Sequence, residues 1–290
     1  MTQNAKLSSR TMSGAILPAI RLAKIRHPDL PRPARLRLNC RPTYPTFAGT
    51  ATAAGPRVSP HGSCTTAPDG CPAAFGMMAV MDVEELIAQH PQVFHTMSAT
   101  AWPSVRRHGL LSTQRLIQLF DLDPAERDRL LNAPRKQSTV LRAPGLAPAV
   151  IRDQKPMKFV TEKIDPDSSL AEYLAAINSR VFFWASGERL DRLRQAKEYR
   201  TEDQVVLHVD TRALVERHGP RIELCRLNSG AVMQKNHPLR GHRSWLPIAD
   251  YPYAEYRRRY GRHGALVEVT VLDAVPDILE LTDKIEGTIN

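Results

Sequence analysis

Residues 264–272, GALVEVTVL, form the clearest strand pattern of the chain and carry one acidic residue near the middle. Successive side chains of a strand point to opposite faces, so Val267, Val269 and Val271 share one face and Glu268 lies on the other. A carboxylate in such an apolar strand costs free energy unless a charged or hydroxyl group meets it. Two interpretations stay open. Glu268 lies in water on an edge strand or in a structural ion pair, or it is a functional carboxylate held in a cleft.

Residues 181–184, VFFW, place three aromatic side chains on another short strand. Alternation predicts that Phe182 and Trp184 share one face and that Phe183 takes the other. Adjacent aromatics usually belong to a core. A ring that faces away from the core, however, offers a flat wall that suits a nicotinamide or a base.

His95 ends the predicted strand 92–97, QVFHTM. A single histidine in this position is commonly structural. It is also able to hydrogen-bond a ribose hydroxyl, because a neutral imidazole both donates and accepts.

Periodicity and capping residues predict the remaining elements. Gly109 is expected to end a helix, Ser112 to cap the next one, and Asp123 with Pro124 to begin a third. Residues 228–262 are expected to be rich in loops. The predicted helices are 81–90, 100–108, 113–120, 124–131, 168–178, 187–199 and 211–218, and the other predicted strands are 149–153, 204–210 and 221–227.

The fold class follows from the order of these elements. Short strands scattered between helices of unequal length indicate an α+β fold rather than a regular βαβ series. No G-x-G-x-x-G follows a strand and no Walker A motif is present, which disfavours Rossmann and P-loop nucleotide sites.

Charge divides the chain into two parts. Residues 1–80 hold ten Lys and Arg against two Asp, together with ten prolines and three aromatics, and we expect a disordered basic tail. A mis-assigned start, a targeting segment and a functional basic arm are the three interpretations of this tail. Residues 81–290, the expected single folded domain, hold 30 basic and 28 acidic residues. The global charge of +10 therefore says little about that domain, where only a local basic patch is expected to hold nucleic acid.

Cysteine usage and hydropathy limit the compartments, metal sites and membrane partners that the sequence supports. Cys225 is the one cysteine after residue 80, which favours a reducing cytoplasm. His61, Cys64 and Cys71 lack the paired spacing of a strong zinc site, and His237 with His242 makes a weak pair, so no metal is predicted. No stretch reaches the roughly 18 apolar residues of a membrane helix, so no membrane partner is expected.

Taken in order, these motifs resemble a known family. The His-Thr strand leading to HGLLS, the mid-chain aromatic strand, and the late VEVTV strand followed by VPDI are similar to the ADP-ribosyltransferase fold in its His-type branch. The parallels are DarT-type DNA ADP-ribosyltransferases, more distantly RNA 2′-phosphotransferases, and an uncharacterised bacterial ADP-ribosyltransferase-like domain family with VFFW…RL and NSG patterns. The resemblance covers roughly residues 85–280. It implies a split mixed β-sheet with flanking helices.

The resemblance also implies roles for individual residues. His95, with Thr96 beside it, would bind the adenosine-side ribose of NAD, and one of Phe182, Phe183 and Trp184 would stack on nicotinamide. Glu268 would be the catalytic carboxylate. Arg152 would meet the pyrophosphate or the developing charge. The family pattern has a tyrosine in the middle strand, and FFW brings no hydroxyl there.

Three functions follow as hypotheses. The first is NAD-dependent ADP-ribosyl transfer to a nucleic-acid or protein acceptor. The second is an NAD- or nucleotide-binding module without transfer, which the missing tyrosine favours. The third is nucleic-acid binding through residues 253–264, YAEYRRRYGRHG, where aromatics between arginines can stack bases and hold phosphates. The alternative for this stretch is a solvated basic helix end. The residues assigned to nucleic acid in this cluster are Tyr256, Arg257, Arg258 and Arg259.

Overall fold

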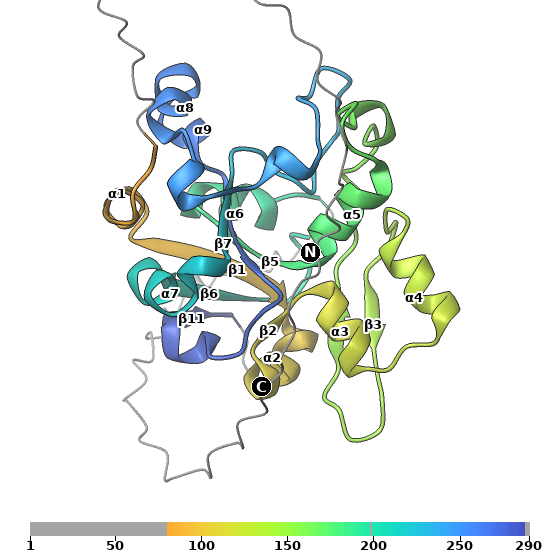
Figure 1. Ribbon diagram of the computed structural model, residues 1–290. Coiled ribbons are helices and arrows are strands. Elements are labelled where there is room, and N and C mark those ends of the chain that lie inside the picture. Colours follow the sequence, from red (N-terminus) through yellow and green to blue (C-terminus); the bar gives the residue numbers. More distant parts are fainter. Residues whose placement is uncertain (1–79, 198, 288–290) are drawn as a thin grey trace, which may run out of the picture. The chain divides into compact units, whose positions relative to one another are not determined.

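A computed structural model describes residues 80–197 and 199–287, which belong to one compact unit (Figure 1). The predictions made for residues 1–79, including the tail and the His61, Cys64 and Cys71 group, lie outside the described residues.

A seven-stranded sheet forms the centre of this unit (Figure 1). Each ladder between its neighbouring strands is antiparallel, so the predicted α+β class is confirmed and the predicted mixed sheet is wrong. The position of β1 explains why the sheet is antiparallel although a helix connects β5 to β6. β5 and β6 are parallel to each other, as a helical crossover requires, but β1 lies between them and runs the other way. In spatial order the strands are β11 (Thr282–Glu286), β6 (Gln204–Asp210), β1 (Gln92–Ser98), β5 (Arg180–Trp184), β9 (Glu268–Leu272), β7 (Ile222–Cys225) and β8 (Leu246–Pro247).

One face of the sheet carries the main core. Val93, Leu207, Phe183 and Val269 alternate inward from four strands and are almost fully buried. Leu86 of α1 (Val83–Gln89) and Leu214 of α7 (Thr211–His218), together with side chains of the segment that leads into α8 (Tyr253–Tyr260), cover this face.

A second core lies against the opposite face. Tyr173, Leu174 and Ile177 of α5 (Leu170–Asn178) pack with Cys225 and Trp245. Together with Leu170, which packs against the same cluster, these residues stand at i, i+3, i+4 and i+7 and form the buried side of the helix. Ser169 and Glu172 close a capping box at its start.

A third cluster forms a lobe beside the sheet (Figure 1). Its hairpin joins β3 (Thr139–Leu141) to β4 (Ala149–Ile151), and α3 (Thr113–Leu119) and α4 (Pro124–Leu131) pack on that hairpin. Only a strand over residues 149–153 was predicted in this region, and the structure shows that it pairs with β3 in a two-stranded sheet.

Local capping signals were reliable. The side chains of Ser112, Asp123 and Asp210 each accept a hydrogen bond from the first turn of the helix that follows. Ser186 stands at the predicted start of α6 (Gly187–Arg194) but its side chain makes no capping bond. This helix ends at Arg194, short of the predicted residue 199.

Gly109 ends α2 (Trp102–His108) as predicted, with φ +72° and ψ −165°. A Cβ at this position would lie 2.4 Å from the Cα of Pro276, so only glycine fits. Here β2 (Leu110–Leu111) pairs with β10 (Ala274–Val275). The motif that opens the family resemblance therefore contacts the motif that closes it.

Two predictions failed near the C-terminal end of the fold. α8 and α9 (Arg262–Ala265) occupy part of the stretch expected to be loop. β9 begins at Glu268 instead of residue 264, because residues 262–265 are taken up by α9.

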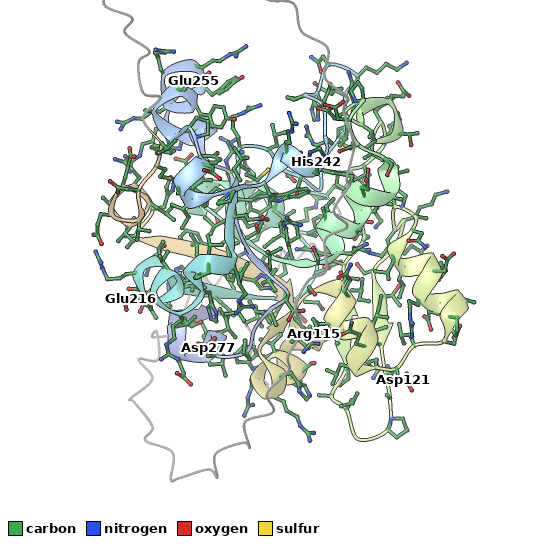
Figure 2. All side chains as sticks on the ribbon, viewed as in Figure 1. Arg115, Asp121, Glu216, His242, Glu255 and Asp277 are labelled. Carbon is green, nitrogen blue, oxygen red and sulfur yellow. The ribbon has the colours of Figure 1, made fainter. Side chains whose placement is uncertain are left out.

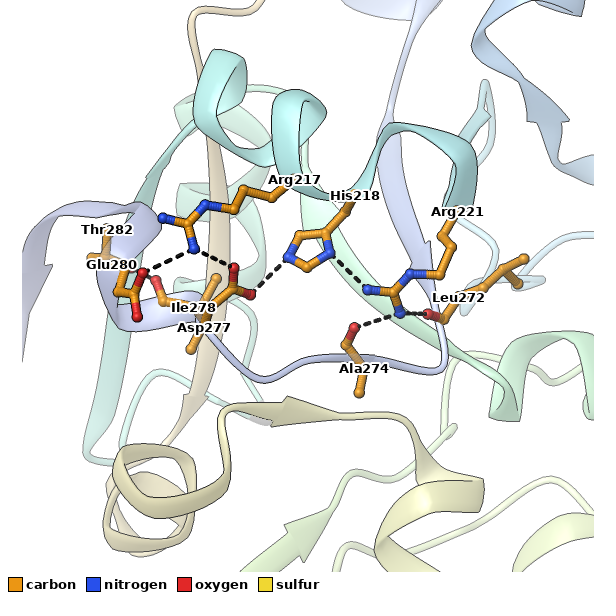
Figure 3. A network of polar contacts seen from close by, with 9 residues as sticks. All are labelled: Arg217, His218, Arg221, Leu272, Ala274, Asp277, Ile278, Glu280 and Thr282. Atoms are coloured by element: carbon orange, nitrogen blue, oxygen red, sulfur yellow. Dashed lines mark hydrogen bonds and ion pairs between the residues drawn. The ribbon is translucent and has the colours of Figure 1, made fainter. Parts of the chain in front are cut away.

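A polar network fixes the chain around α7 (Figure 3). Arg221 donates to the carbonyls of Leu272 and Ala274 and to Nδ1 of His218. Since that nitrogen accepts, Nε2 of His218 carries the proton and donates to Asp277 at 2.7 Å. Asp277 also accepts from Arg217, so one carboxylate joins α7 to the segment after β10.

No helix among residues 80–197 and 199–287 is long and apolar enough to cross a membrane.

Candidate functional site

A cavity of about 700 Å³ lies where the sheet splits. β1 and β5 pair only at Phe94 opposite Trp184, and beyond that point they diverge. The cavity is lined by both strands, by Glu268 at the start of β9, by residues 228–230, by the β3–β4 hairpin and by part of α2. α2 packs against β4 and β2, and its residues Ser104 and Val105 form part of the cavity wall.

Glu268 belongs to a central strand of the sheet. Trp184 of β5 and Cys225 of β7 are its cross-strand neighbours, and the residue is only 4% exposed. These neighbours exclude the edge-strand interpretation, and no ion pair of Glu268 is found within the described part of the chain.

The two carboxylate oxygens of Glu268 differ in their partners. Oε1 accepts a hydrogen bond from the backbone amide of Ser229 at 3.0 Å, whereas Oε2 is buried without a partner. Burial raises the pKa of Glu268 to about 7, opposed by hydrogen bonds from Ser229 and by the positive charges of Arg240 and Arg189. A buried carboxylate that titrates near neutrality at a cavity wall is typical of a functional acid or base.

Ser229 is a site residue that the sequence analysis did not identify. The Tyr173 hydroxyl donates to its carbonyl oxygen at 2.9 Å, so α5 positions the loop that meets Glu268. The sequence signal was the run Asn228, Ser229 and Gly230, which belongs to the family resemblance as its NSG pattern but was given no role in the site. Its approach to a carboxylate 39 positions away depends on the tertiary fold.

His95 lies inside β1, which continues to Ser98, and not at a strand end. Nδ1 of His95 lies 2.8 Å from the carbonyl oxygen of Phe182, so the side chain bridges the split between β1 and β5. Burial lowers the pKa of His95 to about 4; the bond to Phe182 opposes this shift and the charge of Arg152 adds to it. The ring is therefore neutral at pH 7, with the proton on Nδ1 and an acceptor lone pair on Nε2.

The aromatic strand alternates as predicted. Phe183 is 1% exposed and lies in the main core, with its ring 5.7 Å from that of His95. Phe182 and Trp184 are half-buried, share the face of Glu268, and line the cavity.

Thr96 and Arg152 also line the cavity. The Thr96 hydroxyl already donates to Gln204 at 3.1 Å. The Arg152 guanidinium lies 4.3 Å above the ring of Tyr199, and no acidic side chain of the described residues forms an ion pair with it. Tyr199, whose hydroxyl donates to Asp153 at 3.0 Å, is a second lining residue that the sequence analysis missed.

The Tyr–Arg cluster lies on α8, outside the cavity lining. Tyr256 packs edge-on against Tyr251 at 5.3 Å, while Arg257, Arg258 and Arg259 are exposed. The structure therefore groups the other predicted site residues and leaves these four at a separate surface.

No group of three or more His, Cys, Asp or Glu suited to a metal ion occurs among the residues that the structure describes. His237 and His242 have different partners, the carbonyl of Ala231 and the hydroxyl of Ser168.

Comparison with known proteins gives one match. Residues 91–282 match a family of unknown function, DUF7002. No curated protein and no solved structure matches the chain. The matched range runs from the residue before β1 to the first residue of β11, so it includes the other six strands of the main sheet and all the cavity residues named above. The chain belongs to the DUF7002 family.

Proposed function

We propose that this protein is an ADP-ribosyltransferase that takes NAD as its substrate and transfers ADP-ribose to a macromolecular acceptor. The observation that carries the proposal is Glu268 itself: a buried carboxylate with one unpartnered oxygen, at the wall of a cavity that it shares with the neutral His95 ring. A cavity of about 700 Å³ falls in the ordinary range for small-molecule sites.

The residues present fit the parts of NAD. Ribose hydroxyls are donors. Oε2 of Glu268 is an acceptor without a partner among the described residues, and Nε2 of His95 is an acceptor because Nδ1 carries the proton toward Phe182. Trp184 and Phe182 offer half-buried rings for the nicotinamide. Arg152 supplies a positive charge for the pyrophosphate, and Thr96 lies next to His95.

The proposed reaction breaks the bond between the ribose carbon and the nicotinamide nitrogen, and the electron pair leaves with nicotinamide. A nucleophilic oxygen or nitrogen of the acceptor forms the new bond to that carbon and loses a proton. Glu268 holds the ribose hydroxyl, stabilises the positive charge that develops on the sugar, and accepts the proton of the nucleophile. A carboxyl with a pKa of about 7 is suited to that last step at neutral pH.

A second candidate is an NAD- or nucleotide-binding module without transfer. Two observations favour it: Phe182, Phe183 and Trp184 bring no hydroxyl to the cavity, and the Tyr199 hydroxyl is engaged by Asp153. Either form would work in a reducing cytoplasm, a setting that suits the buried free thiol of Cys225.

The test combines calorimetric NAD binding with nicotinamide release by the full-length chain. We expect both for the wild type, and a loss of release by roughly a hundred- to thousandfold in Glu268→Gln with binding retained. Glu216→Gln, on the exposed side of α7, is the control and should behave as wild type.

Two other results would redirect the assignment. Binding without release, with and without nucleic-acid or protein acceptors, favours the binding module. Absence of binding at millimolar NAD, or full activity in Glu268→Gln, would overturn the proposed function.

A further inference from the structure

A small pocket of about 150 Å³ lies outside the cavity, between residues 238–244 and α8. In Figure 2, His242 and Glu255 mark these two segments. Arg226, His242, Arg243 and Tyr256 are among the residues that line the pocket. Its lining holds one acidic residue, Asp165, whose carboxylate already accepts from the amide of Asp167. The pocket is therefore positively charged and suits an anion such as a phosphate group.

Arg226 connects this pocket to an aromatic surface. Its guanidinium lies 5.5 Å from the ring centre of Tyr256 and 4.1 Å from that of Tyr260. Arg259 approaches the Tyr260 ring at 5.3 Å, and Tyr260 is 39% exposed. Exposed rings held among guanidinium groups are surfaces on which nucleic-acid bases stack.

The charge of α8 extends the same surface. Arg257, Arg258 and Arg259 follow one another on the exposed side, and none forms an ion pair with an acidic residue of the described part of the chain. Surface arginines are usually neutralised in part by neighbouring carboxylates. Three consecutive free ones next to a positive pocket indicate a polyanionic ligand.

The chain itself links this surface to the cavity. Arg226 and Leu227 line the small pocket, and Asn228, Ser229 and Gly230 line the cavity. Ser229, the residue bonded to Glu268, comes three positions after Arg226, and three residues span at most about 11 Å. The docking surface and the cavity wall therefore adjoin along this segment.

We infer that the arginine–tyrosine surface, made of Arg226, Arg243, Tyr256, Tyr260 and residues 257–259, docks single-stranded nucleic acid. The pocket takes a phosphate and Tyr260 takes a base. Bases in a duplex are already stacked and paired, and an acidic peptide has no flat rings to place on Tyr260, so a single strand uses both features. That the docked strand is also the acceptor rests on the proposed transferase activity. Docking itself does not.

The test is fluorescence anisotropy of the full-length chain with a labelled single-stranded DNA of about 16 nucleotides, without NAD, between about 50 and 200 mM salt. Arg226→Gln/Arg243→Gln should weaken binding at least about tenfold and flatten the salt slope by about 0.7, since the pocket holds one phosphate and each neutralised single-strand phosphate contributes roughly 0.7. Arg106→Gln/Arg127→Gln removes the same charge from exposed sites elsewhere and should bind as wild type. The basic residues before residue 80 are common to all variants.

Stacking is tested separately at Tyr260. Tyr260→Ala should lose about fivefold to a hundredfold in affinity without changing the salt slope, and Tyr260→Phe should keep the affinity. Glu268→Gln should bind DNA as wild type does. DNA docking is therefore tested independently of NAD cleavage.

The inference is overturned if the Arg226/Arg243 variant binds like its control, if Tyr260→Ala binds like wild type, or if an acidic polypeptide of equal charge displaces the DNA as well as unlabelled DNA does. If the protein cleaves NAD but does not bind DNA, the docking inference is wrong and the proposed function stands.

Discussion

Glu268 is the residue at which local preference and tertiary environment disagree most. Its strand is otherwise apolar, and the fold supplies one amide donor for two carboxylate oxygens. Burial without full hydrogen bonding favours the protonated form. The pKa of Glu268 is therefore raised to about 7, and the stability of the folded state depends on pH.

Glu268→Gln should become more stable than wild type as the pH rises. The pKa is higher in the folded state than the ordinary value of 4.5, so stability falls as the pH rises from about 4.5 to about 7. Glutamine does not titrate, and the difference between variant and wild type should grow by roughly 3 kcal/mol over that window. Urea unfolding at about pH 4 and pH 8 measures it. A difference independent of pH, or one matched by the exposed control Glu216→Gln, would contradict the assignment.

At the scale of elements, Gly109 decides how α2 turns into β2. Its backbone has φ +72° and contacts Val275 and Pro276, so the two-stranded β2–β10 ladder depends on the absence of a side chain.

Gly109→Ala should cost more than Gly261→Ala, its matched control. Gly261 follows α8 with φ +72° and ψ 173°, and a Cβ there would meet nothing within 4 Å. Each change places an alanine in a glycine region and costs about 1–3 kcal/mol. At Gly109 the clash should add roughly another 1–3 kcal/mol. Chemical unfolding of both variants measures the difference, and equal costs would show that contact with Pro276 is relieved without loss.

The polar network around α7 (Figure 3) is the second feature at the scale of elements. Asp277→Ala removes the acceptor of both His218 and Arg217 and leaves a buried imidazole N–H unpaired. We expect a loss of roughly 1.5–3 kcal/mol in the free energy of unfolding. Glu280→Ala removes an exposed partner of the same Arg217 and should cost less than about 1 kcal/mol. If the two costs are alike, the buried histidine is not the reason for the network.

At the scale of the whole molecule, Arg135 joins the lobe to α5, which packs on the sheet. Its guanidinium donates to the carbonyls of Leu130 and Arg152 and to the side chain of Asn178 on α5, and the residue is 8% exposed. Burial lowers the pKa of Arg135 to about 10, opposed by Asp153, and the group still carries its charge at pH 7. The cavity lies between the parts that this side chain connects.

Arg135→Met should loosen the lobe before the sheet. Three buried acceptors lose their donor, which costs roughly 2–5 kcal/mol after allowing for the relief of a buried charge. Hydrogen exchange should quicken in residues 113–153 more than in β5, β6 and β9. Arg129→Met, at an exposed site of the same lobe, is the control. Uniform acceleration across the sheet would show that the lobe and the sheet unfold as one unit.

The candidate site could be predicted from the sequence only in part. The alternation of Phe182, Phe183 and Trp184 follows from strand geometry, so the sequence sufficed to place them on their faces. The neutrality of His95 results from its burial in the tertiary fold, its tautomer from the Phe182 carbonyl across the split, and the cavity position of Tyr199 from the lobe. Neither contact leaves a local pattern.

By itself the sequence determined the α+β class, most helices and their caps, and the faces of the central strands, because these depend on residues a few positions apart. The tertiary structure alone decided the antiparallel order, the helix over residues 253–260, the split between β1 and β5, and the approach of Ser229 to Glu268. These depend on contacts between segments far apart in the chain, whose free energy no local window contains.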